Sequence, residues 1–191
     1  MKRKVNLMLI CLSLSTLTFA QSQEQQEKSS SKTVEFLAKD GTFFKKEFYD
    51  LPTVGSSYSK VDCQVLIITD MKTNEKRGCL RLTTYYSSSV SNDDYIGTLD
   101  PDELDACIIC LDKIQTDIAT TTPETYTEAE YKTRDGVHIG TYWNDRKKEW
   151  VIYVQTKNYT TRSLSQVSSA NVPVLIQNLK NAKQMIADKT K

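Results

Sequence analysis

The chain has 191 residues, of which 26% are charged and 39% are hydrophobic, and its 25 basic and 24 acidic side chains give a formal charge of +1. This balance excludes a strongly basic protein of the kind that binds nucleic acid or anionic membranes through concentrated positive charge. The length fits one domain with a hydrophobic core.

The first twenty residues have the pattern of a secretory signal peptide. Three basic residues at positions 2–4 precede an uncharged, Leu-rich run over residues 5–19, and Ala20 stands before Gln21 at a cleavage site. Cleavage removes three basic and no acidic side chains, which leaves 22 basic against 24 acidic residues and a formal charge of −2. We therefore expect a periplasmic or secreted protein without a membrane span after cleavage.

The rest of the chain divides into a tether and a domain. Residues 21–32 (QSQEQQEKSSSK) contain no apolar side chain and are predicted to be disordered. We expect one α+β domain over residues 33–191. A Thr-rich segment around Pro123 marks a linker that divides it into two similar halves, 33–118 and 127–188.

Alternating apolar and polar residues predict two hairpins in the first half. In the first, Val34, Phe36 and Ala38 alternate before the turn-forming pair Asp40-Gly41, and apolar residues return over residues 44–49. In the second, one alternating segment around residues 61–67 is followed, after a polar turn, by another around residues 80–83.

The four cysteines that remain after cleavage permit up to two disulfides in an oxidising compartment. We expect most of them to be buried and free. If the second hairpin turned between residues 73 and 74, Cys63 would face Thr84 and Cys79 would face Ile68, out of register for a bridge. The other two, Cys107 and Cys110, form a CxxC.

That CxxC lies within a predicted helix that runs from Asp100 to about Ile118. Asp100 is its N-cap, Pro101 suits the first helical position and Glu103 completes a capping-box pattern. Cys107 falls beyond the first turn, where the helix dipole lowers a thiol pKa, so we expect core residues and not a redox pair. The apolar stripe of this helix comprises Leu104, Cys107, Ile108, Leu111 and Ile118.

The second half repeats the outline of the first. Asp135-Gly136 follows Asp40-Gly41 at an offset of 95 residues, and alternating strands follow it around residues 139–154. A closing helix, with Asn171 as its N-cap, carries the apolar residues Leu175, Leu179, Ala182 and Ile186. Leu82 lies 18 residues before the first cap and Ile152 lies 19 residues before the second.

We therefore predict an α+β fold with antiparallel sheets and two helices packed on one face, and we leave open an imperfect internal duplication. Strands followed by a long helix, given twice, resemble the duplicated ββββα units of the whirly and PUR-type single-stranded nucleic-acid binders. The resemblance is one of topology. It implies no site residues, because no residue motif of those families is matched.

Aromatic residues are enriched in the second half, where a half-exposed row could stack sugars or bases. Cross-strand packing is the simpler explanation, and we favour it, because aromatic residues pair readily across hairpins. The ligand-binding candidates are Tyr142, Trp143, Trp150 and Tyr153.

No catalytic or metal-binding set emerges from the sequence. His138 is the single histidine, so no second imidazole can complete a zinc site or a triad, and we expect it to point to solvent from a strand. An acidic cluster lacks the spacing of a calcium loop, and we attribute it to the start of the helix. Its members are Asp93, Asp94, Asp100, Asp102, Glu103 and Asp105.

We expect a secreted or periplasmic, non-catalytic binding protein, without a cofactor or bound metal, whose partner is a protein or a carbohydrate. Two alternatives stay open: a single-stranded nucleic-acid binder, which export makes less favourable, and an enzyme with an unrecognised carboxylate site. A homodimer is also left open. A nucleic-acid binder would use a basic groove formed by Lys45, Lys46, Arg81, Arg146, Lys147 and Lys148.

Overall fold

The computed structural model describes residues 31–56 and 59–191. The predicted signal peptide, residues 1–20, and residues 21–30 of the predicted tether lie outside the described residues. The last two tether residues, Ser31 and Lys32, belong to the folded part, because Ser31 is fully buried and α1 begins at Lys32.

The first unit contains four strands and four helical segments. In chain order these are α1 (Lys32–Leu37), β1 (Phe44–Ser56), β2 (Ser59–Asp70), β3 (Lys76–Ser87), β4 (Asn92–Leu99), a 3-10 turn (Pro101–Glu103), α2 (Leu104–Lys113) and a π-helical turn (Ile114–Ile118). The second unit contains β5 (Glu128–Lys132), β6 (His138–Asn144), β7 (Glu149–Gln155), a 3-10 turn (Thr161–Ser163), β8 (Leu164–Val167), a 3-10 turn (Ser169–Asn171) and α3 (Val172–Lys189).

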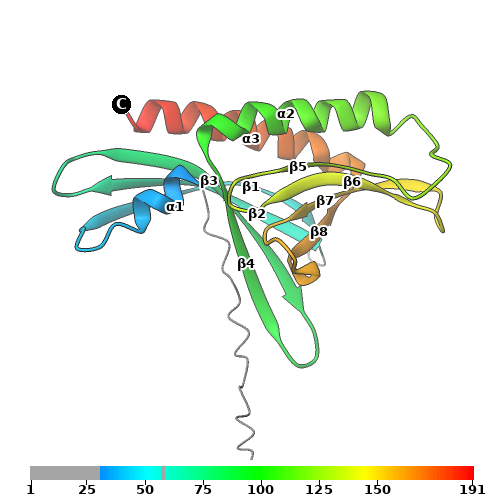
Figure 1. Ribbon diagram of the computed structural model, residues 1–191, viewed down its shortest axis with the longest axis horizontal. Coiled ribbons are helices and arrows are strands. Elements are labelled where there is room, and N and C mark those ends of the chain that lie inside the picture. The colour runs from blue at the N-terminus through cyan, green and yellow to red at the C-terminus, as the bar shows by residue number, and fades with distance from the viewer. Residues whose placement is uncertain (1–30, 57–58) are drawn as a thin grey trace, which may run out of the picture.

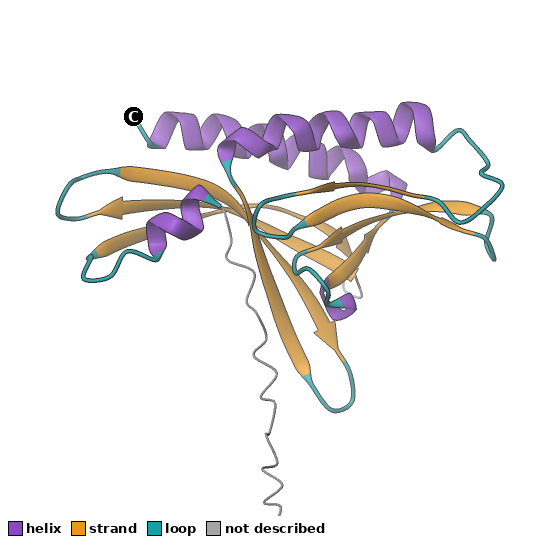
Figure 2. Ribbon diagram, viewed as in Figure 1, coloured by secondary structure: helices purple, strands orange, loops and turns teal. Residues whose placement is uncertain are grey.

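The strands form two antiparallel four-stranded sheets in chain order, β1-β2-β3-β4 in sheet A and β5-β6-β7-β8 in sheet B. A long helix follows each sheet, and α2 and α3 lie side by side on one side of both sheets (Figures 1 and 2). The predicted α+β fold, with two helices packed on one face, is therefore confirmed. Among the described residues, no helix is long and apolar enough to cross a membrane.

Both units contribute to one hydrophobic core. Buried residues of sheet A and sheet B, such as Leu82 and Ile139, pack in the same cluster as Leu111 of α2 and Leu179 of α3. Each such side chain contributes roughly 1.5–3 kcal/mol when fully buried. Seven residues of the two predicted helix stripes are buried: Leu104, Cys107, Leu111, Leu175, Leu179, Ala182 and Ile186. The other two, Ile108 and Ile118, are partly buried and pack against the same core.

The first predicted hairpin is wrong, because the segment from Val34 to Leu37 is helical. The Ser31 hydroxyl accepts a hydrogen bond from the N–H of Val34 at 3.3 Å and caps α1. Phe36 then packs on the outer face of sheet A, against Leu66 and Ile68. Tertiary contacts thus override the short strand-like alternation, and Asp40-Gly41 joins a helix to β1.

The second hairpin is present, but its register differs from the prediction by two residues. Cys63 pairs with Leu82, and Cys79 pairs with Leu66. The side chain of Asp70 accepts the N–H of Lys72 at 2.8 Å, which closes the turn earlier along the chain than expected. A two-residue shift keeps every side chain on its predicted face.

All four described cysteines are free, as expected, and Cys63, Cys79 and Cys107 are buried. Burial raises the pKa of Cys63 and of Cys79 to about 12, and it also raises the pKa of Cys107. These thiols therefore stay protonated and behave as small core residues.

The 95-residue offset between the two Asp-Gly pairs does not join equivalent positions. Asp40-Gly41 precedes the first strand of its unit, whereas Asp135-Gly136 lies between β5 and β6. The similar spacing from strand to helix cap, 18 residues from Leu82 and 19 from Ile152, does join equivalent positions, because both residues lie in the third strand of a sheet.

The second unit lies against the free edge of β4. The carboxylate of Asp135 accepts the N–H of Thr98 at 2.8 Å, and the Thr156 hydroxyl donates to the carbonyl of Tyr95 at 3.0 Å. Gly97 lies in β4 between Tyr95 and Thr98, and a Cβ at this position would lie 2.3 Å from a methyl group of Val137. The close approach therefore requires glycine at this position.

A buried carboxylate joins α1, the start of α2 and sheet B. Asp100 is fully buried and accepts the N–H groups of Lys32 at 2.8 Å and Thr33 at 3.1 Å, and the Thr33 hydroxyl at 2.7 Å. Arg134, between β5 and β6, donates to Asp100 at 3.0 Å. Glu103 accepts the N–H of Asp100 and that of Arg134, each at 2.8 Å, so the predicted capping box is present and also reaches the second unit.

Replacing Asp100 with Ala should lower the free energy of unfolding by about 3 kcal/mol, because it leaves the N–H groups of Lys32 and Thr33 without their acceptor and removes one of the carboxylates that bind Arg134. Urea denaturation measures the change. Asp105→Ala is the matched control, because Asp105 forms an exposed ion pair with Lys183 and should change stability by about 1 kcal/mol or less. Equal effects of the two substitutions would contradict the role of Asp100.

Candidate functional site

The four aromatic candidates lie on two opposite faces of sheet B. Trp143 and Trp150 pair across β6 and β7, with ring centroids 5.5 Å apart, on the core-facing side. Tyr142 and Tyr153 lie on the outer side, with centroids 6.0 Å apart. The structure therefore brings them together as two cross-strand pairs and not as one row.

Most of these aromatic groups have partners within the fold. The Trp150 indole donates to the carbonyl of Thr121 at 2.8 Å, and Tyr153 donates to Glu130 at 2.8 Å. Trp143 and Tyr153 are buried, with 5% and 4% of their surfaces exposed. Their contacts are those of packing residues, which leaves Tyr142 and Trp150 as the more accessible members.

His138 does not point freely to solvent as we expected. Its Nδ1 lies 2.8 Å from Glu130, its Nε2 lies 3.2 Å from Asn158, and its side chain is 12% exposed. Burial raises the pKa of Glu130, but hydrogen bonds from His138 and Tyr153 outweigh it and hold that pKa below its ordinary value. With both ring nitrogens engaged, His138 is poorly placed to act as a general base.

The basic residues considered for nucleic acid do not gather in one groove. Lys45 and Lys46 lie at the start of β1, whereas residues 146–148 lie in the turn between β6 and β7, at the other end of the molecule (Figure 1). Lys45 pairs with Glu47 at 3.1 Å, and Lys148 pairs with Asp145 at 2.7 Å.

All members of the acidic cluster except Asp94 form ion pairs with described residues. Asp100 and Asp102 bind Arg134, Asp105 binds Lys183 at 2.6 Å, and Asp93 lies 3.8 Å from Arg162. Within residues 31–56 and 59–191, no three His, Cys, Asp or Glu side chains are arranged to hold a metal ion.

The sequence did not single out the polar hollow on the outer face of sheet A. It has a volume of about 480 Å³ and lies on the half of this face that α1 leaves open. We call it the sheet A groove. Its lining residues are Asp50, Leu51, Thr53, Lys60, Asp62, Cys63, Gln64, Arg81, Thr83, Tyr85 and Asp94.

Asp62 is the centre of one hydrogen-bonded group in the groove. It accepts from Thr53 at 2.7 Å, from Lys60 at 3.1 Å and from the hydroxyl of Tyr85. Burial raises the pKa of Asp62, but hydrogen bonds from Tyr85, Thr53 and Lys60 bring it below the ordinary value. Burial and the neighbouring carboxylate raise the pKa of Tyr85 to about 12, so at neutral pH one group is ionised and the other is protonated.

A second polar row crosses three strands. Gln64 donates to Asp50 at 2.7 Å and accepts from Nη1 of Arg81. The Arg81 guanidinium lies 5.8 Å from the ring centroid of Phe48, which is 51% exposed at the rim. Among the described residues Arg81 has no ion-pair partner, and its other N–H groups are available to a ligand.

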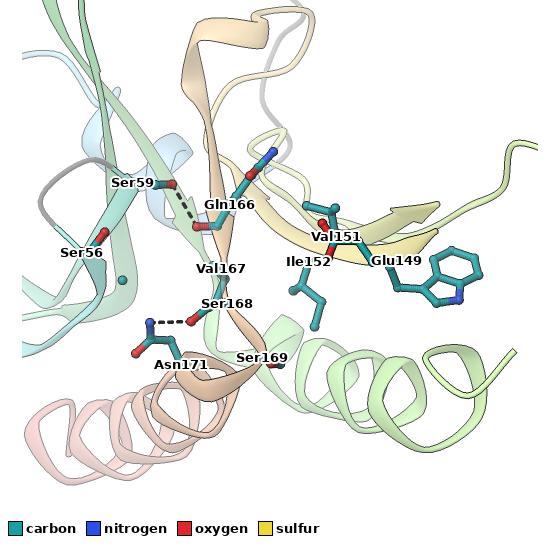
Figure 3. A pocket seen from close by; sticks show the side chains of 12 residues that line it. Ser56, Ser59, Glu149, Val151, Ile152, Gln166, Val167, Ser168, Ser169 and Asn171 are labelled. Atoms are coloured by element: carbon teal, nitrogen blue, oxygen red, sulfur yellow. Dashed lines mark hydrogen bonds between the residues drawn. The ribbon is translucent and has the colours of Figure 1, made fainter. Parts of the chain in front are cut away.

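A second hollow, the junction pocket, lies where β7 and β8 meet the ends of β1 and β2 (Figure 3). It has a volume of about 470 Å³. Ser59 donates to the carbonyl of Gln166 at 2.9 Å, and Asn171, the predicted helix cap, donates to the Ser168 hydroxyl at 2.9 Å. Its lining residues are Gly55, Ser56, Ser59, Glu149, Trp150, Val151, Ile152, Gln166, Val167, Ser168, Ser169 and Asn171.

Comparisons with protein-family models, with curated proteins and with solved structures found no match to this chain. The resemblance to whirly and PUR-type proteins therefore rests on the order of strands and helices alone.

The free energy of unfolding should fall as the pH drops below about 4, the ordinary carboxyl pKa. A carboxyl whose pKa is lowered in the folded state stabilises the fold above that pH, and this contribution is lost as the pH falls through the folded-state pKa. Asp62→Asn should weaken the acid-induced loss, as measured by urea denaturation between pH 3 and pH 7.

Asp94→Asn is the control on the same face, because the exposed Asp94 makes no hydrogen bond or ion pair with a described residue. This substitution leaves the hydrogen bonds to Asp62 in place, so the acid-induced loss that depends on Asp62 should remain. If the Asp62 variant kept the full acid-induced loss, the hydrogen bonds at Asp62 would not matter for stability.

Proposed function

We propose that the protein is exported to the periplasm or the extracellular space and acts there as a non-catalytic binding protein whose sheet A groove takes a carbohydrate. Export is inferred from the basic, apolar and small-residue pattern of residues 1–20. The observation that carries the proposal is the polar row across sheet A beside the exposed ring of Phe48.

The groove presents both kinds of hydrogen-bonding group on a rigid sheet. Arg81 supplies N–H donors, while the exposed Asp50 and Asp94 supply carboxylate oxygens. Sugar hydroxyls donate and accept together, so neighbouring donors and acceptors suit them. The face of Phe48 offers an apolar surface on which the C–H side of a sugar ring can pack.

The charge of the groove favours a sugar over nucleic acid. Its lining contains three carboxylates, from Asp50, Asp62 and Asp94, against two cations, from Lys60 and Arg81. A phosphate backbone would be repelled by this excess of negative charge, whereas a neutral sugar would not.

The carboxyl groups favour binding over glycoside hydrolysis. A glycosidase needs one carboxyl with a raised pKa to act as general acid. In the described part of the chain, each carboxyl with a clear shift has a lowered pKa, including Asp62 in the groove and Glu130 on sheet B. An ionised Asp62 can accept hydrogen bonds but does not donate a proton.

Calorimetric titration with neutral oligosaccharides of glucose, galactose, mannose and N-acetylglucosamine tests the proposal. Arg81→Met should weaken binding of the preferred sugar at least tenfold, because it removes charged donors worth about 1.5–3 kcal/mol. Phe48→Ala should weaken it about threefold to tenfold through lost ring contact. Lys147→Met, in the turn between β6 and β7, should leave the affinity unchanged.

Three results would count against carbohydrate binding. The first is that none of the sugars binds, or that the affinity for the bound sugar is the same in both groove variants as in the wild type. The second is release of shorter sugars during incubation, which would favour the enzyme alternative. The third is salt-sensitive retention of single-stranded oligonucleotides, which would favour the nucleic-acid alternative.

Export has its own test. The protein recovered from the producing cells should begin at Gln21 when its intact mass is measured, because cleavage is expected after Ala20. An intact chain that begins at Met1 and stays in the cytosol would contradict this part of the proposal.

A further inference from the structure

One edge of β7 is open for three residues. β6 pairs with β7 along Glu149–Gln155, whereas β8 pairs with it only from Ile152 to Gln155. After Val167 the chain leaves the sheet and turns into the helical segment that begins at Ser169. The space that β8 would have filled, beside Glu149–Val151, is the junction pocket (Figure 3).

The main chain of Trp150 faces this pocket. The N–H of Trp143 donates to Thr127 on the β5 side at 2.9 Å, so the peptide groups of the preceding residue, Tyr142, point to β7. Tyr142 pairs with Val151, whose carbonyl also accepts the hydroxyl of Thr141 on β6 at 3.1 Å. Because peptide groups alternate along a strand, those of Trp150 point the other way, toward the missing part of β8.

The walls of the pocket suit a peptide main chain. β7 lines one side of the pocket, Gly55, Ser56 and Ser59 line the side formed by sheet A, and Ser168 and Ser169 line the part where the chain leaves β8. These small side chains leave room for the side chains of an added strand. The open edge is about 10 Å long at 3.3 Å per residue, enough for three residues to pair.

The charge of the pocket determines which peptide side chains it favours. Glu149 is the single charged residue among those that line the pocket, and its side chain is 52% exposed. Lys147 lies 3.6 Å away but is itself 67% exposed, so the carboxylate remains open to another cation. An acidic segment would be repelled, whereas a basic side chain beside Glu149 would be attracted.

We infer that the junction pocket binds an extended segment of a partner protein, which pairs with the main chain of Trp150 as an added strand and places a Lys or Arg beside Glu149. The occupant is a peptide because its alternating N–H and C=O groups match those of an open strand edge. This site is separate from the sheet A groove, and the inference does not depend on carbohydrate binding.

Selection from a library of random heptapeptides with the purified full chain tests the inference. Enriched sequences should alternate apolar and polar residues and contain Lys or Arg. A synthetic peptide of the enriched sequence should bind the protein saturably in calorimetry. The same peptide with its basic residue changed to Glu should bind at least tenfold more weakly, and N-methylation of alternate peptide groups should abolish binding.

Two variants with matched controls locate the site. Ser169→Trp should abolish binding by filling the pocket, whereas Ala170→Trp, at the exposed neighbouring position outside the lining, should not. Glu149→Lys should reverse the preference from the Lys peptide to the Glu peptide, whereas Glu128→Lys, on the exposed surface of β5, should leave it unchanged. Circular dichroism establishes that each variant is folded.

The inference is overturned if no heptapeptide is enriched over the Ser169→Trp protein, or if the selected peptide binds that variant as tightly as the wild type. Binding that survives N-methylation would also overturn it, because strand pairing would then play no part. Dimers detected by sedimentation without peptide, and lost in the Ser169→Trp variant, would assign the edge to a second copy of the chain instead.

Discussion

The buried carboxylate of Asp100 is the interaction on which the arrangement of this protein depends. A short helix such as α1, with six residues, does not form stably by itself, and its first N–H groups need acceptors. Asp100 supplies those acceptors and also binds Arg134 from the second unit. One side chain therefore fixes the position of α1 on sheet A and joins the two ββββα units.

The position of α1 in turn determines which surface is open. Phe36 covers Leu66, Ile68 and Cys79, so the apolar half of the outer face of sheet A is buried. The other half of the same face keeps its polar residues in contact with solvent and becomes the sheet A groove. The candidate site is thus the part of the outer face of sheet A that the docked helix α1 does not cover.

Elements that follow from regular periodicity could be predicted from the sequence. Elements whose structure is determined by tertiary contacts could not. Both helix stripes and the capping box around Asp100 followed from spacing alone. The strand proposed around Phe36 was wrong, because Asp100, 64 residues further along the chain, supports a helix there. The groove could not be found from spacing, because its polar rows exist only in the observed register of three strands. A signal was present in the polar positions of β2 and β3, but pairing them correctly required the turn closed by Asp70.

The contact at Gly97 has a consequence for association between molecules. A strand at the border of a sheet offers free N–H and C=O groups that can recruit a strand from another molecule and begin aggregation. In β4 the N–H of Thr98 and the carbonyl of Tyr95 are instead taken by Asp135 and Thr156, and the lack of a side chain at Gly97 lets Val137 close over the strand between them. The second unit thereby covers this edge of sheet A. A chain shortened after α2 would expose β4 as an edge strand and should aggregate with other copies of itself.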